Sequence, residues 1–301
     1  PAPGTASRPA RALRALRAYV ALTKPRIIEL LLVTTLPTML LAAGGLPPAG
    51  TVVATLVGGA LAAGSANAYN QYFDRDIDAV MTRTHHRPIP SGAVGPRAAL
   101  AYATALGAVA TALLWWATTP LAAGLGVLAI LLYVVGYTLI LKRRTPQNIV
   151  WGGAAGCMPV LIAWAAVTGG LSPAAGVLFL VVFFWTPPHY WPLSLRFRDD
   201  YAAAGVPMLP VVAPPREVAR QVLGHTGAMV AATLILVPVA GMGWVYSVTA
   251  VAAGAVFVVA AAGFARRLRR GEPPRAMGLF HVSISYLTVV FVAVGIDALV
   301  R

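Results

Sequence analysis

Asn70, Asp74 and Asp78 follow one another at intervals of four residues, directly after a long apolar stretch. On a helix such positions share one face, one turn apart, so an amide and two carboxylates point the same way. Unpaired carboxylates are costly beside hydrocarbon, so a positive charge is expected to accompany them. Amide and carboxylate oxygens are the ligands that hard divalent cations prefer. This acidic ladder (Asn70, Asp74, Asp78) therefore predicts a cation site that is shared with an anionic substrate.

A second acidic cluster lies in the segment HYWPLSLRFRDDYAAAGVPMLPVV. Its two carboxylates, Asp199 and Asp200, are adjacent, so on a helix they point about 100° apart and do not share one ion. We expect Asp200 to be a further ligand, and Asp199 either to form an ion pair or to support the ligands without touching the ion. Arg196 precedes Asp200 by one turn and is expected to contact a phosphate oxygen.

Basic side chains follow both the ladder and a later apolar run. Arg83 and Arg87 come shortly after Asp78, and Lys142 and Arg143 follow the later run. The planar fork of arginine suits phosphate oxygens. Acidic clusters beside basic loops therefore predict a metal-bridged diphosphate. The alternative is that these basic residues only reflect the preference for positive charge in cytoplasmic loops, as expected for the run at 266–270.

Asp76 lies between the carboxylates of the ladder in sequence but on another face of the helix. It is about 200° around the helix axis from Asp74, since successive residues turn by about 100°. We therefore expect it to pair with Arg75 or Arg83 rather than to bind the cation.

The composition is that of a membrane protein. Hydrophobic residues make up 58% of the chain and charged residues 11%, and the mean hydropathy is +0.76. These values predict a polytopic protein embedded in a lipid bilayer. A net charge of +14 would also suit nucleic acid. The charges fall in short clusters between apolar runs, however, so we expect no nucleic acid among its partners.

Apolar runs long enough to cross a bilayer divide the chain. We place nine spans at 27–45, 51–73, 98–118, 121–141, 148–168, 172–192, 220–241, 247–265 and 278–299. Of the 23 lysines and arginines, 22 lie in the N-terminal tail or in the loops on its side, when Arg220 at the start of its span is counted with the preceding loop, and only Arg301 lies opposite. The positive-inside rule puts that side in the cytoplasm. We expect an all-α polytopic membrane protein with nine transmembrane helices around a central cavity and a cytoplasmic N-terminus.

Two parts of unequal size follow from this division. Residues 1–18 are expected to form a disordered or interfacial tail, in which Arg11, Arg14 and Arg17 recur at helical spacing. Residues 19–301 are expected to form a single transmembrane domain.

Three segments carry a resemblance to a known family. The ladder segment NQYFDRDIDAVMTRTHHRPIPSG, the second acidic cluster and the nine spans resemble the UbiA superfamily of intramembrane prenyltransferases. Within that superfamily, LKRRTPQNIV and the block from HYW to MLPVV resemble the branch that farnesylates haem. The likeness covers roughly residues 18–300.

The resemblance implies transfer of farnesyl from farnesyl diphosphate to a vinyl group of haem B, with water added, at the cytoplasmic side of a bacterial inner membrane. It implies Mg²⁺ as cofactor, and a haem A synthase or another oxidase-assembly protein is a further expected partner. The residues that would hold Mg²⁺ on the diphosphate are Asn70, Asp74, Asp78 and Asp200. Those that would neutralise the diphosphate are Arg83, Arg87, Lys142, Arg143 and Arg196.

Four further side chains are candidates for contact with haem or with the prenyl chain. Tyr72, Tyr137 and Trp185 offer electron-rich rings to an allylic cation, although aromatic residues in membrane helices commonly serve as packing or interface anchors. His189 could ligate haem iron, orient a propionate or move a proton. A purely structural, hydrogen-bonded histidine is the alternative.

Two other functions remain open from the sequence. The same chemistry could act on a quinone precursor or another aromatic acceptor, because the acidic ladder does not distinguish acceptors. A cation-coupled transporter also needs intramembrane carboxylates near broken helices. It would place them near the bilayer midplane, whereas these clusters are expected at one face.

Overall fold

The computed structural model describes residues 8–300, and within them the side chains outside 8–11 and 26–32. All the regular secondary structure in this part of the chain is helical, and it contains no strand. Eight helical segments are long and apolar enough to cross a membrane. They are α3 (Ala49–Phe73), α5 (Pro96–Ala117), α6 with η1 (Pro120–Leu131 and Leu132–Leu141), α7 with α8 (Asn148–Gly152 and Ala154–Thr168), α9 (Pro173–Arg196), α12 (Pro215–Ala240), α13 (Trp244–Arg269) and α14 (Ala276–Val300). The predicted class, an all-α polytopic membrane protein, is confirmed.

The remaining predicted span corresponds to α2 (Pro25–Ala43). Its described side chains form a shorter apolar segment, Val33–Ala43. Eight of the nine spans are therefore found by length and composition, and the count of nine stays a prediction.

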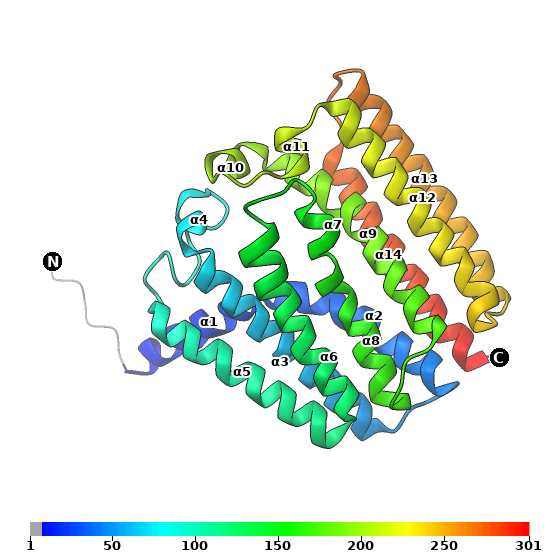
Figure 1. Cartoon of the computed structure of the whole chain (residues 1–301), viewed down its shortest axis with the longest axis horizontal. Helices are drawn as coiled ribbons and strands as arrows, with labels where there is room; N and C mark the ends of the chain where they lie inside the picture. The colour runs from blue at the N-terminus through cyan, green and yellow to red at the C-terminus, as the bar shows by residue number, and fades with distance from the viewer. Residues whose placement is uncertain (1–7, 301) are drawn as a thin grey trace.

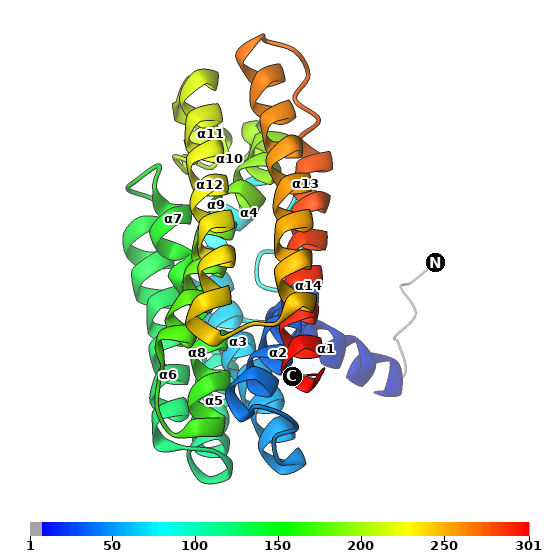
Figure 2. The same cartoon turned by 90° about the vertical axis from the view of Figure 1, so that its right-hand side faces the viewer.

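The N-terminal segment is helical before it reaches the bundle. Helix α1 covers Arg8–Thr23, so the predicted boundary at residue 18 falls inside a helix. Its arginines Arg14 and Arg17 are exposed, whereas Leu22 is fully buried. Figure 2 shows α1 leaving the bundle at an angle to the long helices. The predicted tail residues 1–7 lie outside the described residues.

The long helices pack through small residues and one large apolar core. That core joins α9, α12, α13 and α14 around fully buried residues such as Leu178, Met229 and Phe291. Between α3 and α5 the helices approach closely, because a Cβ at Gly58 would lie 2.7 Å from the Leu114 side chain. Such small-residue contacts are typical of helix pairs in membranes.

Three short helices lie together near one end of the bundle (Figures 1 and 2). They are α4 (Arg75–Val80), α10 (Arg198–Ala203) and α11 (Leu209–Val212). An apolar cluster holds them against one another. It includes Ile77 of α4, Tyr201 of α10 and Met208, which directly precedes α11. Both acidic clusters of the sequence are thereby brought to this end.

Candidate active site

The acidic ladder lies where α3 passes into α4. Helix α3 ends at Phe73, yet the backbone N–H of Asp74 still donates to Asn70 O at 2.9 Å and that of Asp78 to Asp74 O at 2.8 Å. The helical register therefore continues, and the three side chains stay on one face. Asn70 Nδ2 donates to Asp74 Oδ2 at 2.7 Å. All three residues are buried, with Asp74 at 0% and Asp78 at 1% relative exposure.

Basic side chains from distant segments neutralise the buried carboxylates. Lys142 Nζ, 68 residues away, donates to Asp74 Oδ2. Arg87 Nη1 donates to both carboxylate oxygens of Asp78 at 2.8 Å. Each buried charge of the ladder therefore has an opposite charge in direct contact, as the cost of burying an isolated carboxylate requires.

Asp76 pairs with Arg143, so the expectation of Arg75 or Arg83 as its partner is wrong. Two guanidinium nitrogens of Arg143 bind the two carboxylate oxygens at 2.7 and 2.8 Å. The hydrogen bonds from Arg143 lower the pKa of Asp76 to about 2. Arg75 instead donates to Tyr72 O at 2.7 Å and lies over the Tyr72 ring. Which arginine pairs with Asp76 therefore depends on how the loops fold, and the spacing in the sequence does not predict it.

One oxygen of the ladder is left over. Asp74 Oδ1 is buried and has no hydrogen-bond partner among the described residues, with Arg143 Nη2 at 3.8 Å. No three acidic, histidine or cysteine side chains in the described part of the chain surround one point as a preformed metal cage. A hard cation needs about six oxygen ligands. The ladder therefore fits a divalent cation that arrives with an oxygen-rich anion and takes its remaining ligands from it.

Lys24 is a site residue that the sequence analysis missed. Its Nζ donates to Asn70 Oδ1 at 2.8 Å, and its backbone takes the left-handed conformation (φ 52°) between α1 and α2. Burial, with Arg87 and Lys142 nearby, lowers the pKa of Lys24 well below its usual value. The chain contains only two lysines, Lys24 and Lys142. Both lie at the ladder, and this rarity was the available signal.

A stretch of π-helix presents the second lysine. In η1 the Thr138 hydroxyl donates to Tyr133 O, five residues back, at 2.9 Å. The same hydroxyl accepts from Asn70 Nδ2 at 3.1 Å. Lys142 directly follows this helix, and its N–H donates to Tyr137 O at 2.8 Å, again five residues back. π-Helical turns occur frequently at functional sites, and here the wider turn positions Thr138 and Lys142 against the ladder.

Asp200 joins α10 to the loop that follows α4. Its Oδ1 accepts from the Thr82 hydroxyl at 2.6 Å and the Thr82 N–H at 3.3 Å, and its Oδ2 accepts from the Arg83 N–H at 3.1 Å. The hydrogen bond from the Thr82 hydroxyl is the main cause of a lowered pKa at Asp200. Both oxygens are thus engaged by the loop that carries Arg83 and Arg87. The metal role expected for Asp200 stays a prediction.

The other predicted phosphate ligands are distributed unequally. Arg83 Nη2 donates to the Tyr201 hydroxyl at 3.2 Å, and its guanidinium lies 5.4 Å from the centre of the Phe197 ring. Tyr201, buried and bonded to the Tyr190 hydroxyl at 3.1 Å, was not anticipated from the sequence. Arg196 ends α9 with an exposed side chain and takes part in none of the ion pairs found among the described residues.

The aromatic candidates fall into two groups. Tyr137 lies in η1 close to the ladder, 5.5 Å from the Tyr133 ring, and Gly152 leaves room for it because a Cβ there would meet Tyr137 Cδ2. Trp185 and His189 lie together on α9, with ring centres 4.1 Å apart. Tyr72 packs instead with the apolar cluster beneath α1, so the structure does not bring it to the ladder.

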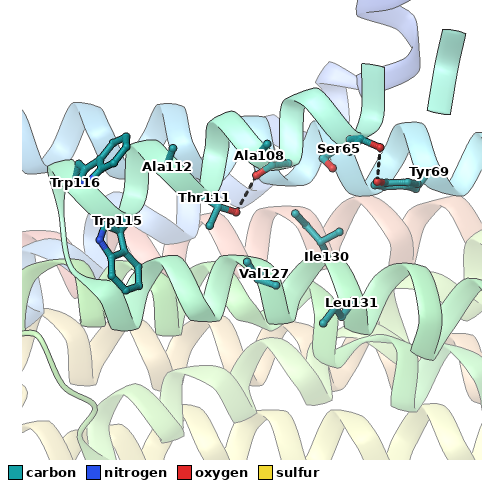
Figure 3. A pocket seen from close by; sticks show the side chains of 12 residues that line it. Ser65, Tyr69, Ala108, Thr111, Ala112, Trp115, Trp116, Val127, Ile130 and Leu131 are labelled. Carbon is teal, nitrogen blue, oxygen red and sulfur yellow. Dashed lines mark hydrogen bonds between the residues drawn. The ribbon is translucent and has the colours of Figure 1, made fainter. Parts of the chain in front are cut away.

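An apolar groove of about 610 Å³ lies between α3, α5 and α6. Figure 3 shows Trp115 and Trp116 at one end of it and Tyr69 at the other. The Tyr69 hydroxyl bonds to Thr104 Oγ1 of α5 at 2.8 Å, whereas the neighbouring Asn70 faces η1. The groove therefore occupies a different face of α3 from the ladder. The central cavity stays a prediction.

Comparison with known proteins gives the context of this site. Residues 31–284 match the model of the UbiA prenyltransferase family. A protein of Pseudarthrobacter chlorophenolicus named protoheme IX farnesyltransferase is 57% identical over 289 residues, which cover 95% of this chain and 91% of that protein. Another of the same name, from Kineococcus radiotolerans, is 56% identical and covers 98% of this chain and 91% of its own.

A solved structure has a similar fold at low sequence identity. It is a UbiA homologue from Archaeoglobus fulgidus bound to GPP and Mg²⁺, with a TM-score of 0.66 and 17% identity, covering 92% of this chain and 99% of that one. At this identity the likeness concerns the fold alone. The family match spans most of the chain, and the relatives match nearly all of it. The chain therefore belongs to the UbiA prenyltransferase family.

Proposed function

We propose that this protein transfers the farnesyl group of farnesyl diphosphate to a vinyl group of haem B, with addition of water, to give haem O and diphosphate. The observation that carries the proposal is the 57% identity, over 95% of the chain, to a protein named protoheme IX farnesyltransferase. The acidic ladder and its basic partners supply the groups that such a reaction needs at the diphosphate.

The diphosphate would be bound at the ladder together with Mg²⁺. Asn70, Asp74 and Asp78 would hold the ion, with Asp74 Oδ1, which accepts no hydrogen bond from the described residues, as its first ligand and Asp200 as a further one. Mg²⁺ there would offset charge on the diphosphate oxygens. The A. fulgidus homologue bound to GPP and Mg²⁺ supports this choice of ion.

The basic residues of the site would change hydrogen-bond partners when the substrate binds. Lys24 holds Asn70, Lys142 holds Asp74 and Arg87 holds Asp78 in the structure. When a cation takes over the carboxylate oxygens, these basic groups become free to bind phosphate oxygens nearby. Arg83 and Arg143 lie on the adjoining loops, and Arg196 is proposed as a more peripheral contact. Charge balance in the buried site is thereby kept before and after substrate binds.

The reaction proceeds by breaking the allylic C–O bond of farnesyl diphosphate. Its electron pair leaves with the diphosphate, whose developing charge the basic side chains stabilise. The π-electrons of the haem vinyl group form the new C–C bond to the allylic cation. A water oxygen then adds to the resulting cation next to the porphyrin and releases a proton. Tyr133 and Tyr137 belong to η1, whose Thr138 contacts Asn70 of the ladder. Their rings would shield the allylic cation from early capture by water.

The reaction would take place at the cytoplasmic face of a bacterial inner membrane. The ladder lies at the end of α3 where the basic loops gather, and 22 of the 23 basic residues belong to that side of the predicted topology. The diphosphate end of farnesyl diphosphate is charged and stays in water. A site at this face can therefore bind it while the apolar chain enters the bilayer. A haem A synthase or another oxidase-assembly protein would receive the product.

The test offers two acceptors to the same preparation. The purified full-length protein, in lipid nanodiscs with Mg²⁺ and farnesyl diphosphate, is incubated with haem B and, separately, with a 4-hydroxybenzoate-type aromatic acid. Chromatography and mass spectrometry identify the products. We expect farnesylated haem and an unchanged aromatic acid. A prenylated aromatic acid with unchanged haem would instead support the quinone-precursor alternative and overturn the proposal.

A further inference from the structure

His189 is held on three sides within the pair α9 and α14. Its imidazole lies between the Trp185 ring, at 4.1 Å and 16° between planes, and the Phe280 ring, at 4.6 Å and 26°. Its Nδ1 lies 2.7 Å from the hydroxyl oxygen of Ser283 on α14. Both faces and the Nδ1 edge are therefore covered. The residue is partly exposed, and the edge that these three contacts leave uncovered is the one that carries Nε2.

The partners of Ser283 determine where the imidazole proton lies. Ser283 Oγ is 2.6 Å from the carbonyl oxygen of Phe280. A carbonyl oxygen only accepts, so the hydroxyl hydrogen must lie between these two oxygens. Ser283 Oγ therefore accepts the hydrogen bond from His189, and Nδ1 carries the proton. In the neutral ring Nε2 then keeps its lone pair.

The surroundings keep Ser283 in this role. The residue is fully buried, and its carbonyl oxygen accepts a hydrogen bond from Trp185 Nε1 at 2.7 Å. The same tryptophan that covers one face of the imidazole thus fixes the backbone of its hydrogen-bond partner. Among the described residues, the one hydrogen bond of the His189 side chain is made by Nδ1, and none engages Nε2. The arrangement directs a fixed, unprotonated nitrogen away from α14.

We propose that Nε2 of His189 is an axial ligand of the haem iron and that Ser283 is the positioning residue that fixes its tautomer. This inference rests on the proposed function, which supplies haem as the acceptor. Histidines that bind a metal through one nitrogen regularly donate the other N–H to a fixed acceptor, and this sets the ring orientation and raises basicity. His189 lies seven residues before the end of α9, about 10 Å below it at 1.5 Å per residue. Haem iron held by His189 would therefore lie below the end of α9 that carries Arg196.

The first test measures the tautomer without using activity. Full-length protein labelled with ¹⁵N-histidine is observed by solid-state NMR in nanodiscs without haem, and the His189 signals are assigned with His189→Gln. We expect an N–H signal for Nδ1 and an unprotonated signal for Nε2. Assignment can also be made by the change in Ser283→Ala if His189→Gln does not fold. A proton on Nε2 in the unmodified protein would overturn the inference.

The second test measures ligation by titrating the same protein with ferric haem B and recording its absorption and electron paramagnetic resonance spectra. The spectra should show histidine ligation in the unmodified protein and lose it in His189→Ala. Ser283→Ala should weaken haem binding ~10-fold with ligation retained, the scale typical of a lost partner behind a metal ligand. Ser283→Thr, which keeps a hydroxyl, should restore binding. His225→Ala is the matched control, because His225 on α12 has its Nδ1 on the backbone oxygen of Gln221 and should leave the spectra unchanged.

The outcomes separate this inference from the function on which it rests. Farnesylated haem formed by the unmodified protein, with identical ligation spectra in folded His189→Ala, would overturn the axial ligand and leave the proposed function standing. Loss of histidine ligation in His225→Ala alone would also overturn it. Absence of both haem binding and farnesylated haem in folded, unmodified protein would overturn both proposals.

Discussion

Lys142 donates a hydrogen bond to Oδ2 of Asp74, while Oδ1 of the same carboxylate stays buried without a hydrogen-bond partner in the described part of the chain. The carboxylate is thus neutralised by one bond and still has an oxygen free for a second cation. This relationship connects the fold to the proposed chemistry, because the end of the π-helix just before Lys142 and the end of α3 just before Asp74 meet at this contact.

Removing the charge of Asp74 should stop turnover. Asp74→Asn keeps the shape of the side chain but removes the negative charge that holds the cation, so we expect turnover to fall by ~10²-fold or more. Product formation by protein in nanodiscs is the measurement. Glu217→Gln is the control, since Glu217 pairs with Arg220 at the start of α12, outside the ladder. Normal turnover in Asp74→Asn would remove Asp74 from the metal role.

Breaking the pair from the other side should destabilise the fold. Lys142→Met leaves the buried carboxylate of Asp74 without its main counter-charge, which costs roughly 3–5 kcal/mol in comparable buried pairs. The double variant with Asp74→Asn removes the unpaired charge and should regain most of that stability, while remaining inactive. Denaturation of the detergent-solubilised protein measures both. Arg144→Met, an exposed neighbour, is the control. Equal stability of Lys142→Met and the unmodified protein would contradict the importance of the pair.

Asp200 should control the order of the loop after α4. Asp200→Ala removes the acceptor for the N–H groups of Thr82 and Arg83, so these two amides should exchange hydrogen for deuterium faster. Asp199→Ala changes the adjacent carboxylate, which is exposed, and should leave their exchange unchanged. Hydrogen-exchange mass spectrometry measures both variants. Unchanged exchange in Asp200→Ala would show that the loop is held by other contacts.

The pair of Asp76 and Arg143 should give a small acid-dependent contribution to stability. The pKa of Asp76 in the folded protein is about 2, because Arg143 donates hydrogen bonds to its carboxylate, below the ordinary value of 3.8. The stabilisation is therefore present above pH 3.8 and is lost as the pH falls toward 2. Since 62% of the Asp76 side chain is exposed, solvent screening limits it to ~1 kcal/mol or less. Asp76→Asn should remove this dependence, as measured by unfolding between pH 5 and pH 2. An identical pH dependence in Asp76→Asn would assign it to other carboxyl groups.

The sequence predicts the helices and the ladder because both depend on local spacing. An apolar run of sufficient length leaves few alternatives to a helix in a bilayer, and intervals of four residues place Asn70, Asp74 and Asp78 on one face wherever the helix lies. The break between α3 and α4 does not disturb that face, since the hydrogen bond from Asp78 to Asp74 O carries the register across it.

Partners that are distant in the chain were harder to predict. Lys24 contacts Asn70, 46 residues away, and its own backbone is in the left-handed conformation. No local sequence pattern predicts that turn. Asp200 was expected to bind metal because it is acidic, yet its hydrogen bonds to a loop 117 residues away depend on how α10 packs. The π-helical register of η1 is equally invisible in its apolar sequence. These features follow from tertiary packing, which composition and periodicity do not contain.

The most direct measurement of the central claim is the mass of haem recovered after reaction with farnesyl diphosphate. Unmodified protein in nanodiscs is incubated with haem B, farnesyl diphosphate and Mg²⁺, beside samples that contain a chelator or the Asp74→Asn variant. We predict haem that has gained one farnesyl group and one hydroxyl group, only with the unmodified protein and Mg²⁺. Haem of unchanged mass from folded, unmodified protein supplied with all substrates, or equal product with the chelator, would contradict the account.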